Sequence, residues 1–471
     1  MATMSSAAVE VISKETIKPR NPTPYQLRNY NMSLLDQYSS LVYVPIILFY
    51  PAASDANSTG SKHHDDLHLL KRSLSETLVH FYPMAGRMKD NMTVDCNDEG
   101  IDFFEVRIKG RMCDFMMKSD AHLSLLLPSE VASTNFVKEA QVIVQVNMFD
   151  CGGTAICFCI SNKIADACTM ITFIRSLAGT TNIARRGSSI AAPTTNQNLV
   201  PSFDSTSLFP PSEQLASQVS YPTQDSTSVD KLVSKRFVFD AAKITSAREK
   251  LQSLMHDKYK CHRPTRVEVV SALIWKSAVK SAPPGSISTV THAMNFRKKM
   301  DPPLQDASFG NLCVVVTAVL PATTATTTNP ATKKVSSTSN EEQVALDELS
   351  DFVALLRREI DKVKGDKGCM EKIIQKFIYG HDASVAKDSD VEDKVTALFM
   401  TSWCKFGFYE ADFGWGTPVW VTTVPLIEPK YKNMVFMNDM KCGEGIEVWV
   451  NFLEDDMTKF EHHLREILQL F

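Results

Sequence analysis

The sequence lacks the glycine-rich signatures of the common nucleotide-binding folds. Its 471 residues include only 18 glycines, which form neither a G-x-G-x-x-G fingerprint nor a P-loop. No internal repeat is evident, and no apolar run approaches the roughly 18 residues that a membrane-spanning helix requires. These absences argue against Rossmann and P-loop nucleotide sites, repeat architectures and a membrane-spanning protein.

The sequence also lacks a large excess of charge of either sign. Lys and Arg total 50 against 54 Asp and Glu, so the formal net charge at pH 7 is -4, and the basic residues are dispersed. Such a chain has no electrostatic footprint for nucleic acid or a membrane surface. The opening MATMSSAAVEVISKE holds no apolar stretch of the signal-peptide type, so we expect a cytoplasmic protein. We also expect a monomer with no nucleic-acid or membrane partner.

Cysteine is present without a metal or disulfide pattern. The 11 cysteines are scattered and odd in number, as is typical of free thiols in a reducing compartment. Cys157 and Cys159 should share one face of a strand, and with Cys151 and Cys168 nearby a metal site is conceivable. However, the spacing is not a zinc pattern and no histidine is near in the sequence, so we expect no metal ion.

Length and composition indicate a two-domain globular protein. A chain of 471 residues is longer than a domain with a single hydrophobic core usually is. Its content of 44% hydrophobic and 22% charged residues is normal for a soluble globular protein. Ser, Thr, Pro, Asn and Gln are concentrated at 187–230 and 321–340, a composition that suits a linker or an exposed loop. We therefore predict an N-terminal domain at 1–190, a crossover linker at 191–230 and a C-terminal domain at 231–471.

Hydrophobic periodicity predicts mixed α and β structure in both halves. In the first half we expect strands at 43–50, 93–96, 101–106, 142–148 and 154–160 and helices at 65–81 and 167–177. In the second half we expect strands at 235–240, 288–296, 314–320, 419–424, 434–438 and 446–452 and helices at 241–254, 265–282, 342–363 and the C-terminus. The last three strands should form a meander, and the strands at 93–96 and 101–106 should flank a shared turn.

One stretch that runs from strand to loop to helix is a candidate site. CGGTAICFCISNKIADA, residues 151–167, indicates a Gly-Gly turn, a buried strand, a short polar loop and a helix that opens near Ala165. A buried strand can anchor side chains that the following loop presents to a cleft. The loop offers Asn162 and, four residues later, Asp166, which would lie on one side if the loop turned into helix. An acid here is also favourable simply because it lies near a helix N-terminus.

A second stretch points to a family. Asp412–Gly416 reads DFGWG, within TSWCKFGFYEADFGWGTPVWV. SNKIAD and DFGWG together resemble the paired signatures of the BAHD family, the plant acyl-CoA-dependent acyltransferases, whose first motif is HxxxD, usually SHKIAD. The segments MSLLDQ, HFYPMAGRMKDN, RPTRVEVVSALIWKSA, MNFRKKMDPPL and FGNL also resemble family segments, in family order, so the resemblance covers nearly the whole chain. The opening is similar to a branch that acetylates alkaloid alcohols.

The resemblance implies a fold and a reaction. The fold class is α/β, or α+β with mixed sheets, in two similar domains like chloramphenicol acetyltransferase, with an active-site channel between them. The reaction is transfer of an acyl group, favoured to be acetyl, from a CoA thioester to a hydroxyl of a plant specialised metabolite, favoured to be an alkaloid. Acyl-CoA is then a cosubstrate beside a small-molecule acceptor, and no bound cofactor is expected.

The resemblance also implies roles for single residues. Asn162 occupies the position of the family's histidine, which is the general base. Asp166 matches a family aspartate that pairs with an arginine, and Arg297 matches that arginine. Asp166 should therefore hold the loop rather than exchange protons. Thr401 and Trp403 match residues that assist the oxyanion and place the acyl group, although both also fit a packed core strand. The DFGWG loop should support the channel away from the reacting atoms. Its residues are Asp412, Phe413, Gly414, Trp415 and Gly416.

Asn162 leaves three explanations open, because a carboxamide can donate and accept hydrogen bonds but has no useful pKa as a base. Loss of general-base catalysis costs about 10²–10⁴-fold. The chain is an engineered base-deficient form of an active enzyme, or a natural member whose acceptor needs no base or that uses another base, or a binding or cyclising descendant without acyl transfer. His292 and His381 are candidates for another base, but both also fit ordinary packing or surface histidines.

Overall fold

A computed structural model describes the chain in two compact units. The described residues are 9–52, 61–117, 120–132, 139–187, 200–216, 231–259, 263–283, 285–320, 338–363, 395–424 and 431–471. The first unit comprises Met1–Gln224, Pro302–Cys313 and Phe406–Val424, and the second comprises Asp225–Asp301, Val314–Lys405 and Pro425–Phe471. Two segments that the sequence division assigned to the C-terminal domain therefore belong to the first unit.

The first unit is built on a six-stranded mixed sheet. In spatial order its strands are β1 (Val9–Ile17), β6 (Ile101–Ile108), β7 (Val142–Phe149), β8 (Thr154–Ser161), β3 (Tyr43–Tyr50) and β13 (Trp420–Thr422). β6 and β7 are parallel, and the other neighbours are antiparallel. The inner strands β7, β8 and β3 are buried almost throughout, which explains why they read as continuous apolar runs rather than alternating ones.

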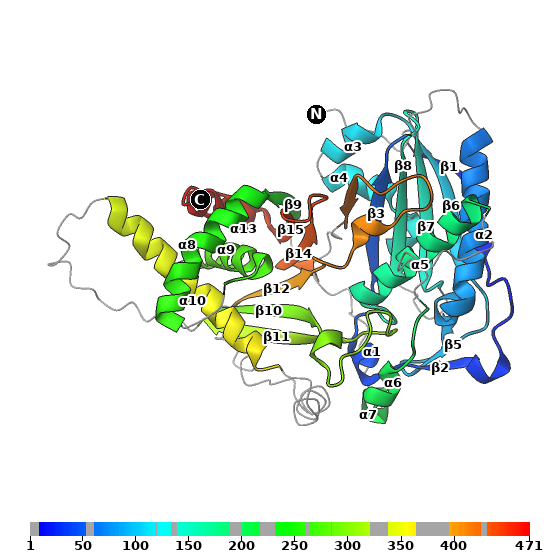
Figure 1. The fold of residues 1–471 in the computed structure, drawn as a ribbon, viewed down its shortest axis with the longest axis horizontal. Helices are drawn as coiled ribbons and strands as arrows, with labels where there is room; N and C mark the ends of the chain where they lie inside the picture. The colour runs from blue at the N-terminus through cyan, green and yellow to red at the C-terminus, as the bar shows by residue number, and fades with distance from the viewer. Residues whose placement is uncertain are drawn as a thin grey trace. The chain divides into compact units, whose positions relative to one another are not determined.

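Helices and a small sheet complete the first unit. The long helices α2 (Ser61–His80) and α5 (Ala167–Arg185) pack against each other (Figure 1). The shorter helices are α1 (Leu34–Tyr38), α3 (Met112–Met117), α4 (Asp120–Leu123), α6 (Ser205–Leu208) and α7 (Glu213–Ala216). Single 3-10 turns lie at Tyr25–Leu27, Tyr82–Ala85, Ser124–Leu126, Ser129–Ala132 and Phe408–Glu410. The small sheet has the order β2 (Asn29–Asn31), β5 (Thr93–Asp95) and β4 (Arg87–Met88).

The second unit has a six-stranded sheet of its own. Its strands are β11 (Cys313–Leu320), β10 (Ile287–Asn295), β12 (Val395–Ser402), β14 (Met434–Asp439), β15 (Ile446–Leu453) and β9 (Leu232–Phe239), in spatial order. β12 is parallel to both its neighbours, and β15 is antiparallel to both of its own. Both units thus join a mixed sheet to helices, as the predicted fold class requires.

Four helices share one hydrophobic core with the second sheet. They are α8 (Ala241–Tyr259), α9 (Arg266–Ser281), α10 (Thr338–Asp361) and α13 (Glu454–Leu468), and a 3-10 turn lies at Arg297–Lys299. Trp275 of α9 is fully buried in this core, with its indole N–H donating to Ser288 Oγ at 2.9 Å. The predicted apolar face of the C-terminal helix is confirmed, because its four apolar residues are buried: Met457, Phe460, Leu464 and Ile467.

The predicted elements agree with the structure more closely than the predicted pairings do. The strand at 43–50 is β3 with the same ends, and the strands at 142–148 and 154–160 form the antiparallel pair β7 and β8. The strands at 93–96 and 101–106 do not pair, because β5 joins the small sheet and β6 the large one.

The predicted meander of three strands is wrong in one strand. β14 pairs antiparallel with β15, but β13 pairs with β3 of the first unit instead. Trp420 of β13 stacks on Phe49 with ring centroids 4.8 Å apart, so an aromatic cross-strand pair stabilises the observed pairing.

Two expectations fall partly or wholly outside the described residues. The loop predicted at 321–340 is described only from residue 338, where α10 begins, and the predicted linker is described only at 200–216. The boundary between domains at 191–230 therefore stays a prediction. Among the described helices, none is both long enough and apolar enough to cross a membrane.

Candidate active site

The backbone of Asn162 is held at both of its polar atoms. β8 ends at Ser161, and residues 162–164 form a turn before α5. The Asn162 N–H donates to the carbonyl of Val42 at 2.8 Å, and its carbonyl accepts from Asn311 Nδ2 at 2.9 Å. Within the described part of the chain, no residue forms a hydrogen bond with the half-buried Asn162 carboxamide. The backbone of the loop is therefore fixed, and the side-chain carboxamide of Asn162, at the predicted catalytic position, is left available for hydrogen bonding.

Asp166 is the N-cap residue of α5. Its Oδ1 accepts from the Thr169 N–H at 2.8 Å, and its Oδ2 accepts from the Leu312 N–H at 2.9 Å. Because α5 begins only after Asp166, the spacing from Asn162 is not a helical one. Both carboxylate oxygens serve backbone amides, so the geometry favours a loop-holding role for this acid.

Residues 306–312, which include the FGNL segment, run along the start of α5. The Thr169 hydroxyl donates to the Gly310 carbonyl at 2.9 Å, and Cys168 Sγ and the Thr172 hydroxyl donate to the Asp306 carbonyl at 3.5 and 3.3 Å. A segment far along the chain therefore supplies the polar partners of the motif loop and of the first turn of α5.

Asp36 lies beneath this segment and was missed by the sequence reasoning. It is fully buried, and burial raises the pKa of its carboxyl. Its Oδ1 accepts from both the backbone N–H and Nδ2 of Asn311, at 2.6 and 3.0 Å, and its Oδ2 accepts from the N–H and hydroxyl of Ser33, at 2.8 and 2.7 Å. The pattern S-x-x-D at 33–36 is a capping-box signature and was the one available signal in the sequence.

Lys163, the residue after Asn162, is bonded to the end of α1, the short helix that contains Asp36. Its Nζ donates to the carbonyls of Gln37 and Ser39 at 2.5 and 3.1 Å. Burial lowers the pKa of Lys163 to about 8, against an opposing effect from the negative charge of Asp36. The ammonium is directed at the carboxyl end of α1, where a cation is favourable.

The DFGWG loop lies against the far end of α5. Asp412 Oδ1 accepts from the N–H groups of Gly414 and Gly416 at 2.8 and 2.9 Å, and the Asp412 carbonyl accepts from Asn182 Nδ2 at 3.2 Å. Asn182 follows Asp166 by 16 residues, which is roughly 24 Å along a helix that rises 1.5 Å per residue. The DFGWG loop is therefore remote from Asn162, and its supporting role stays a prediction.

Packing explains the composition of the DFGWG loop. The rings of Phe413 and Trp415 stack with centroids 5.3 Å apart, and Tyr50 meets both edge-on. The guanidinium of Arg185 lies 5.9 Å from the Trp415 ring centroid. Gly414 has a φ of +96°, and a Cβ there would approach Arg185 Cδ to 2.7 Å, so the position requires glycine.

Three predicted residues belong to the second unit. Thr401 is paired with Ala293 and Phe436 in the sheet, and Trp403 donates its backbone N–H to the Met437 carbonyl at 2.8 Å. The Trp403 side chain is 5% exposed and meets the ring of Phe436 edge-on, so it is packed in the second unit, two residues after Thr401.

Arg297 is fully buried, and its Nη1 donates to Asn295 Oδ1 at 3.2 Å. Its pairing with Asp166 stays a prediction, as do the roles of Thr401 and Trp403. The first unit thus brings together Asn162, Asp166 and FGNL.

His292 is directed at the helical core of the second unit. It shares a sheet face with Ser288, whose hydroxyl is bonded to Trp275 of α9, and it is paired with the core residue Met400. Because side chains alternate along a strand, Thr401 lies on the opposite face. Burial lowers the pKa of His292 to about 4, so this imidazole is neutral at pH 7. His292 is therefore a packing histidine, and His381 lies outside the described residues.

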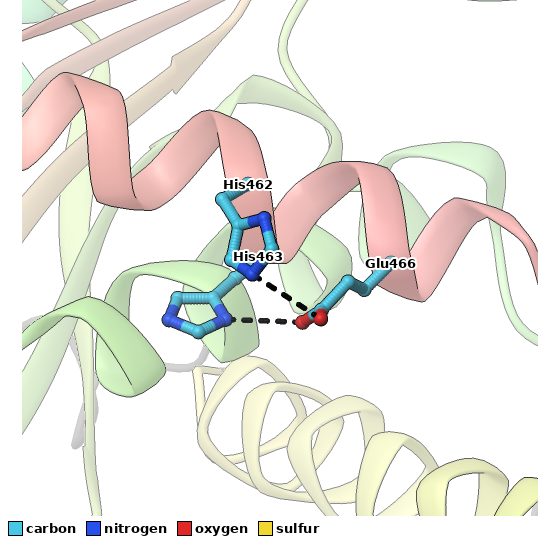
Figure 2. A group of neighbouring side chains, drawn as sticks. All are labelled: His462, His463 and Glu466. Carbon is cyan, nitrogen blue, oxygen red and sulfur yellow. Dashed lines mark hydrogen bonds and ion pairs between the residues drawn. The ribbon is translucent and has the colours of Figure 1, made fainter.

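One group of side chains offers metal ligands within the described ranges, and it lies on α13. Figure 2 shows the imidazoles of His462 and His463 next to each other, both facing the carboxylate of Glu466, with His462 Nε2 3.3 Å from Oε1 and His463 Nδ1 3.2 Å from Oε2. All three ligands come from one helix and all are partly or largely exposed, so the contacts are those of neighbouring polar side chains on a helix surface. Two of the four cysteines near the motif, Cys157 and Cys159, have their sulfur atoms 3.6 Å apart.

Comparisons with known proteins agree on one family. A model of the Transferase family matches residues 7–467. Salutaridinol 7-O-acetyltransferase of Papaver somniferum is 66% identical and is covered, like this chain, over 100% of its length. Stemmadenine O-acetyltransferase of Catharanthus roseus is 32% identical over 98% of both chains. The crystal structure of vinorine synthase matches with a TM-score of 0.74 at 29% identity, covering 98% of each chain, which confirms the mixed α/β fold class. The chain belongs to this transferase family, the BAHD acyltransferases.

Proposed function

We propose that this protein transfers an acetyl group from acetyl-CoA to a hydroxyl of a plant alkaloid. The observation that carries the proposal is the 66% identity over the full length to salutaridinol 7-O-acetyltransferase. The named activity of stemmadenine O-acetyltransferase, a more distant relative, is of the same kind. Acetyl-CoA acts as a cosubstrate, with no resident cofactor, and the protein works as a cytoplasmic monomer.

The reaction needs a base, oxyanion donors and two oriented substrates. The acceptor hydroxyl attacks the thioester carbon and its proton passes to water, while the carbon–sulfur bond breaks and the CoA thiolate takes a proton from water and departs as the thiol. In this proposal the carboxamide of Asn162 orients the hydroxyl or the thioester carbonyl by hydrogen bonding, but it does not take the proton. Turnover is therefore slow compared with that of an enzyme with an imidazole at this position.

The other residues hold or stabilise rather than exchange protons. Asp166 fixes the loop through the amides of Thr169 and Leu312, and Arg297 is its charge partner in the proposal. Thr401 and Trp403 donate hydrogen bonds to the developing oxyanion and place the acyl group.

The test is the substitution Asn162→His. An imidazole has a pKa near neutrality and can accept the hydroxyl proton, so kcat/KM should rise by about 10²–10⁴-fold. Turnover is measured with acetyl-CoA and a panel of alkaloid and terpenoid alcohols, for the protein as it stands, for Asn162→His and for Asn162→Ala as the control without a polar group. The pH profile of the histidine form should rise through the imidazole pKa.

The other outcomes separate the remaining explanations. If the asparagine form is already fast and histidine slows it, the amide has a positive role and the acceptor needs no base. If neither form turns over but both bind acetyl-CoA in a titration, the protein is a binding homologue. If neither form binds CoA, the proposed function is wrong.

A further inference from the structure

We propose that Asn311 and Asp36 are positioning residues for the side chain at position 162. The inference rests on the proposed function in one respect only, that position 162 faces the reacting groups. Neither side chain forms a hydrogen bond with the carboxamide of Asn162. They act on the backbone that carries it.

The first step concerns the peptide that follows Cα of residue 162. Its carbonyl accepts from Asn311 Nδ2 at 2.9 Å, while the preceding N–H is held by the Val42 carbonyl at 2.8 Å. The Val42 contact is a backbone contact that almost any sequence could make. Among the described residues, Asn311 is the side chain that bonds the backbone of residue 162, and it therefore fixes the direction of the Cα–Cβ bond.

The second step explains why residue 311 is an asparagine. Its NH₂ group has two protons, and each has an acceptor: Asp36 Oδ1 at 3.0 Å and the carbonyl of residue 162 at 2.9 Å. An aspartate at 311 would present an acceptor to both of these oxygens, and an alanine would leave both without this donor. The orientation of the amide is thus determined by its two partners.

The third step concerns what holds Asn311. Its own N–H also donates to Asp36 Oδ1, at 2.6 Å, so the carboxylate grips both the backbone and the side chain of this residue. Asp36 is itself fixed by the capping box of α1 through Ser33. A Cβ on the preceding Gly310, whose φ is +110°, would stand 3.3 Å from both Asp36 carboxylate oxygens, so the segment passes close over the carboxylate.

The fourth step is that two adjacent loop residues are attached to one short helix. Asn162 is attached through Asn311 and Asp36, and Lys163 through the carbonyls at the end of α1. The buried Asp36 carboxylate and the Lys163 ammonium also stabilise each other's charged forms. Such a frame suits a site where a displacement of 1 Å can cost 10²-fold in rate, and it assigns a purpose to the MSLLDQ and FGNL segments.

The kinetic test is a double-mutant cycle of Asn311→Ala with Asn162→His. If Asn311 positions residue 162, its removal should reduce the gain in kcat from Asn162→His at least tenfold, with a smaller change in KM for acetyl-CoA. The matched control is Asn147→Ala, because Asn147 is a buried asparagine of the same unit whose Nδ2 bonds the carbonyls of Leu126 and Ala155, away from the loop. The control should leave the gain unchanged.

A second measurement does not depend on acyl transfer. Hydrogen exchange in peptides that cover 162–169 should become faster in Asn311→Ala and stay unchanged in Asn147→Ala, whose effect should be confined to β7, β8 and the turn at Ser124–Leu126. Unchanged exchange in the loop of Asn311→Ala overturns the proposal, as does an equal loss of the kinetic gain in the control. If no form of the protein transfers acyl groups, the proposed function fails. The hydrogen-exchange experiment still decides whether Asn311 positions the loop.

Discussion

Asp166→Ala should destabilise the first unit strongly, because both carboxylate oxygens of Asp166 accept from buried backbone amides. Loss of an N-cap side chain typically costs about 1 kcal/mol, within a range of 0.5–2. Loss of the acceptor for the Leu312 N–H leaves a donor without a partner in a fully buried residue, which costs about 1–3 kcal/mol. The free energy of unfolding should therefore fall by about 1.5–5 kcal/mol.

Asp166→Asn separates the two contributions. Asn caps helices about as well as Asp, so the bond from Thr169 should survive, while the acceptor for the Leu312 N–H and the charge of the carboxylate are lost. Loss of the acceptor alone costs about 1–3 kcal/mol. The order of stability is thus wild type, then Asp166→Asn, then Asp166→Ala.

The assay must report on one unit at a time, because the two units can unfold separately. Tryptophan fluorescence mixes them, since tryptophans occur in both units, at positions 415 and 420 in the first and 275, 403 and 449 in the second. Hydrogen exchange of peptides from β8 and α5, followed across a urea series, reports on the first unit alone. Equal urea midpoints for wild type and Asp166→Ala would show that this carboxylate is not a structural anchor.

Three further predictions use matched changes. Gly414→Ala should lower the melting temperature more than Gly416→Ala: both have positive φ, a strain of about 1–3 kcal/mol, but only at Gly414 does the new Cβ meet a side chain. His292, with its pKa lowered by burial from 6.5 to about 4, protonates in the unfolded chain first as pH falls, so stability should drop by up to about 3 kcal/mol from pH 6.5 to 4, a slope that His292→Leu should remove. Lys163, with its pKa lowered by burial from 10.5 to about 8, loses its proton in the folded chain first as pH rises, so stability should gain about 2 kcal/mol from pH 8 to 10, and Lys163→Met should lack this gain. Urea midpoints measured at several pH values check both slopes, and parallel pH curves for variant and wild type would contradict them.

Local sequence patterns predicted the elements well because their causes are local. The apolar run at 43–50 and the spacing of apolar residues in the C-terminal helix depend on neighbours within a few positions. Strand partners are different. β13 has the same short apolar pattern as a meander strand, and its pairing with β3, across more than 370 residues, depends on aromatic packing between Trp420 and Phe49 that no local pattern records. The same limit explains why a division by composition did not separate the segments Pro302–Cys313 and Phe406–Val424, which cluster with the first unit.

The candidate site follows the same division between local and long-range causes. Asp166 could be predicted as a helix N-cap from its own neighbourhood, and its acceptance of the Thr169 amide is local. Its second partner, Leu312, lies 146 positions away, and the carbonyl of Asn162 meets Asn311 at a separation of 149. Such contacts exist only after the chain has folded. The sequence therefore showed MSLLDQ and FGNL as family segments, but it did not show that they bind the loop at Asn162. Both carboxylate oxygens of Asp166 accept from backbone amides, so in our proposal the proton chemistry depends on the side chain at position 162, and a single substitution there tests the proposal.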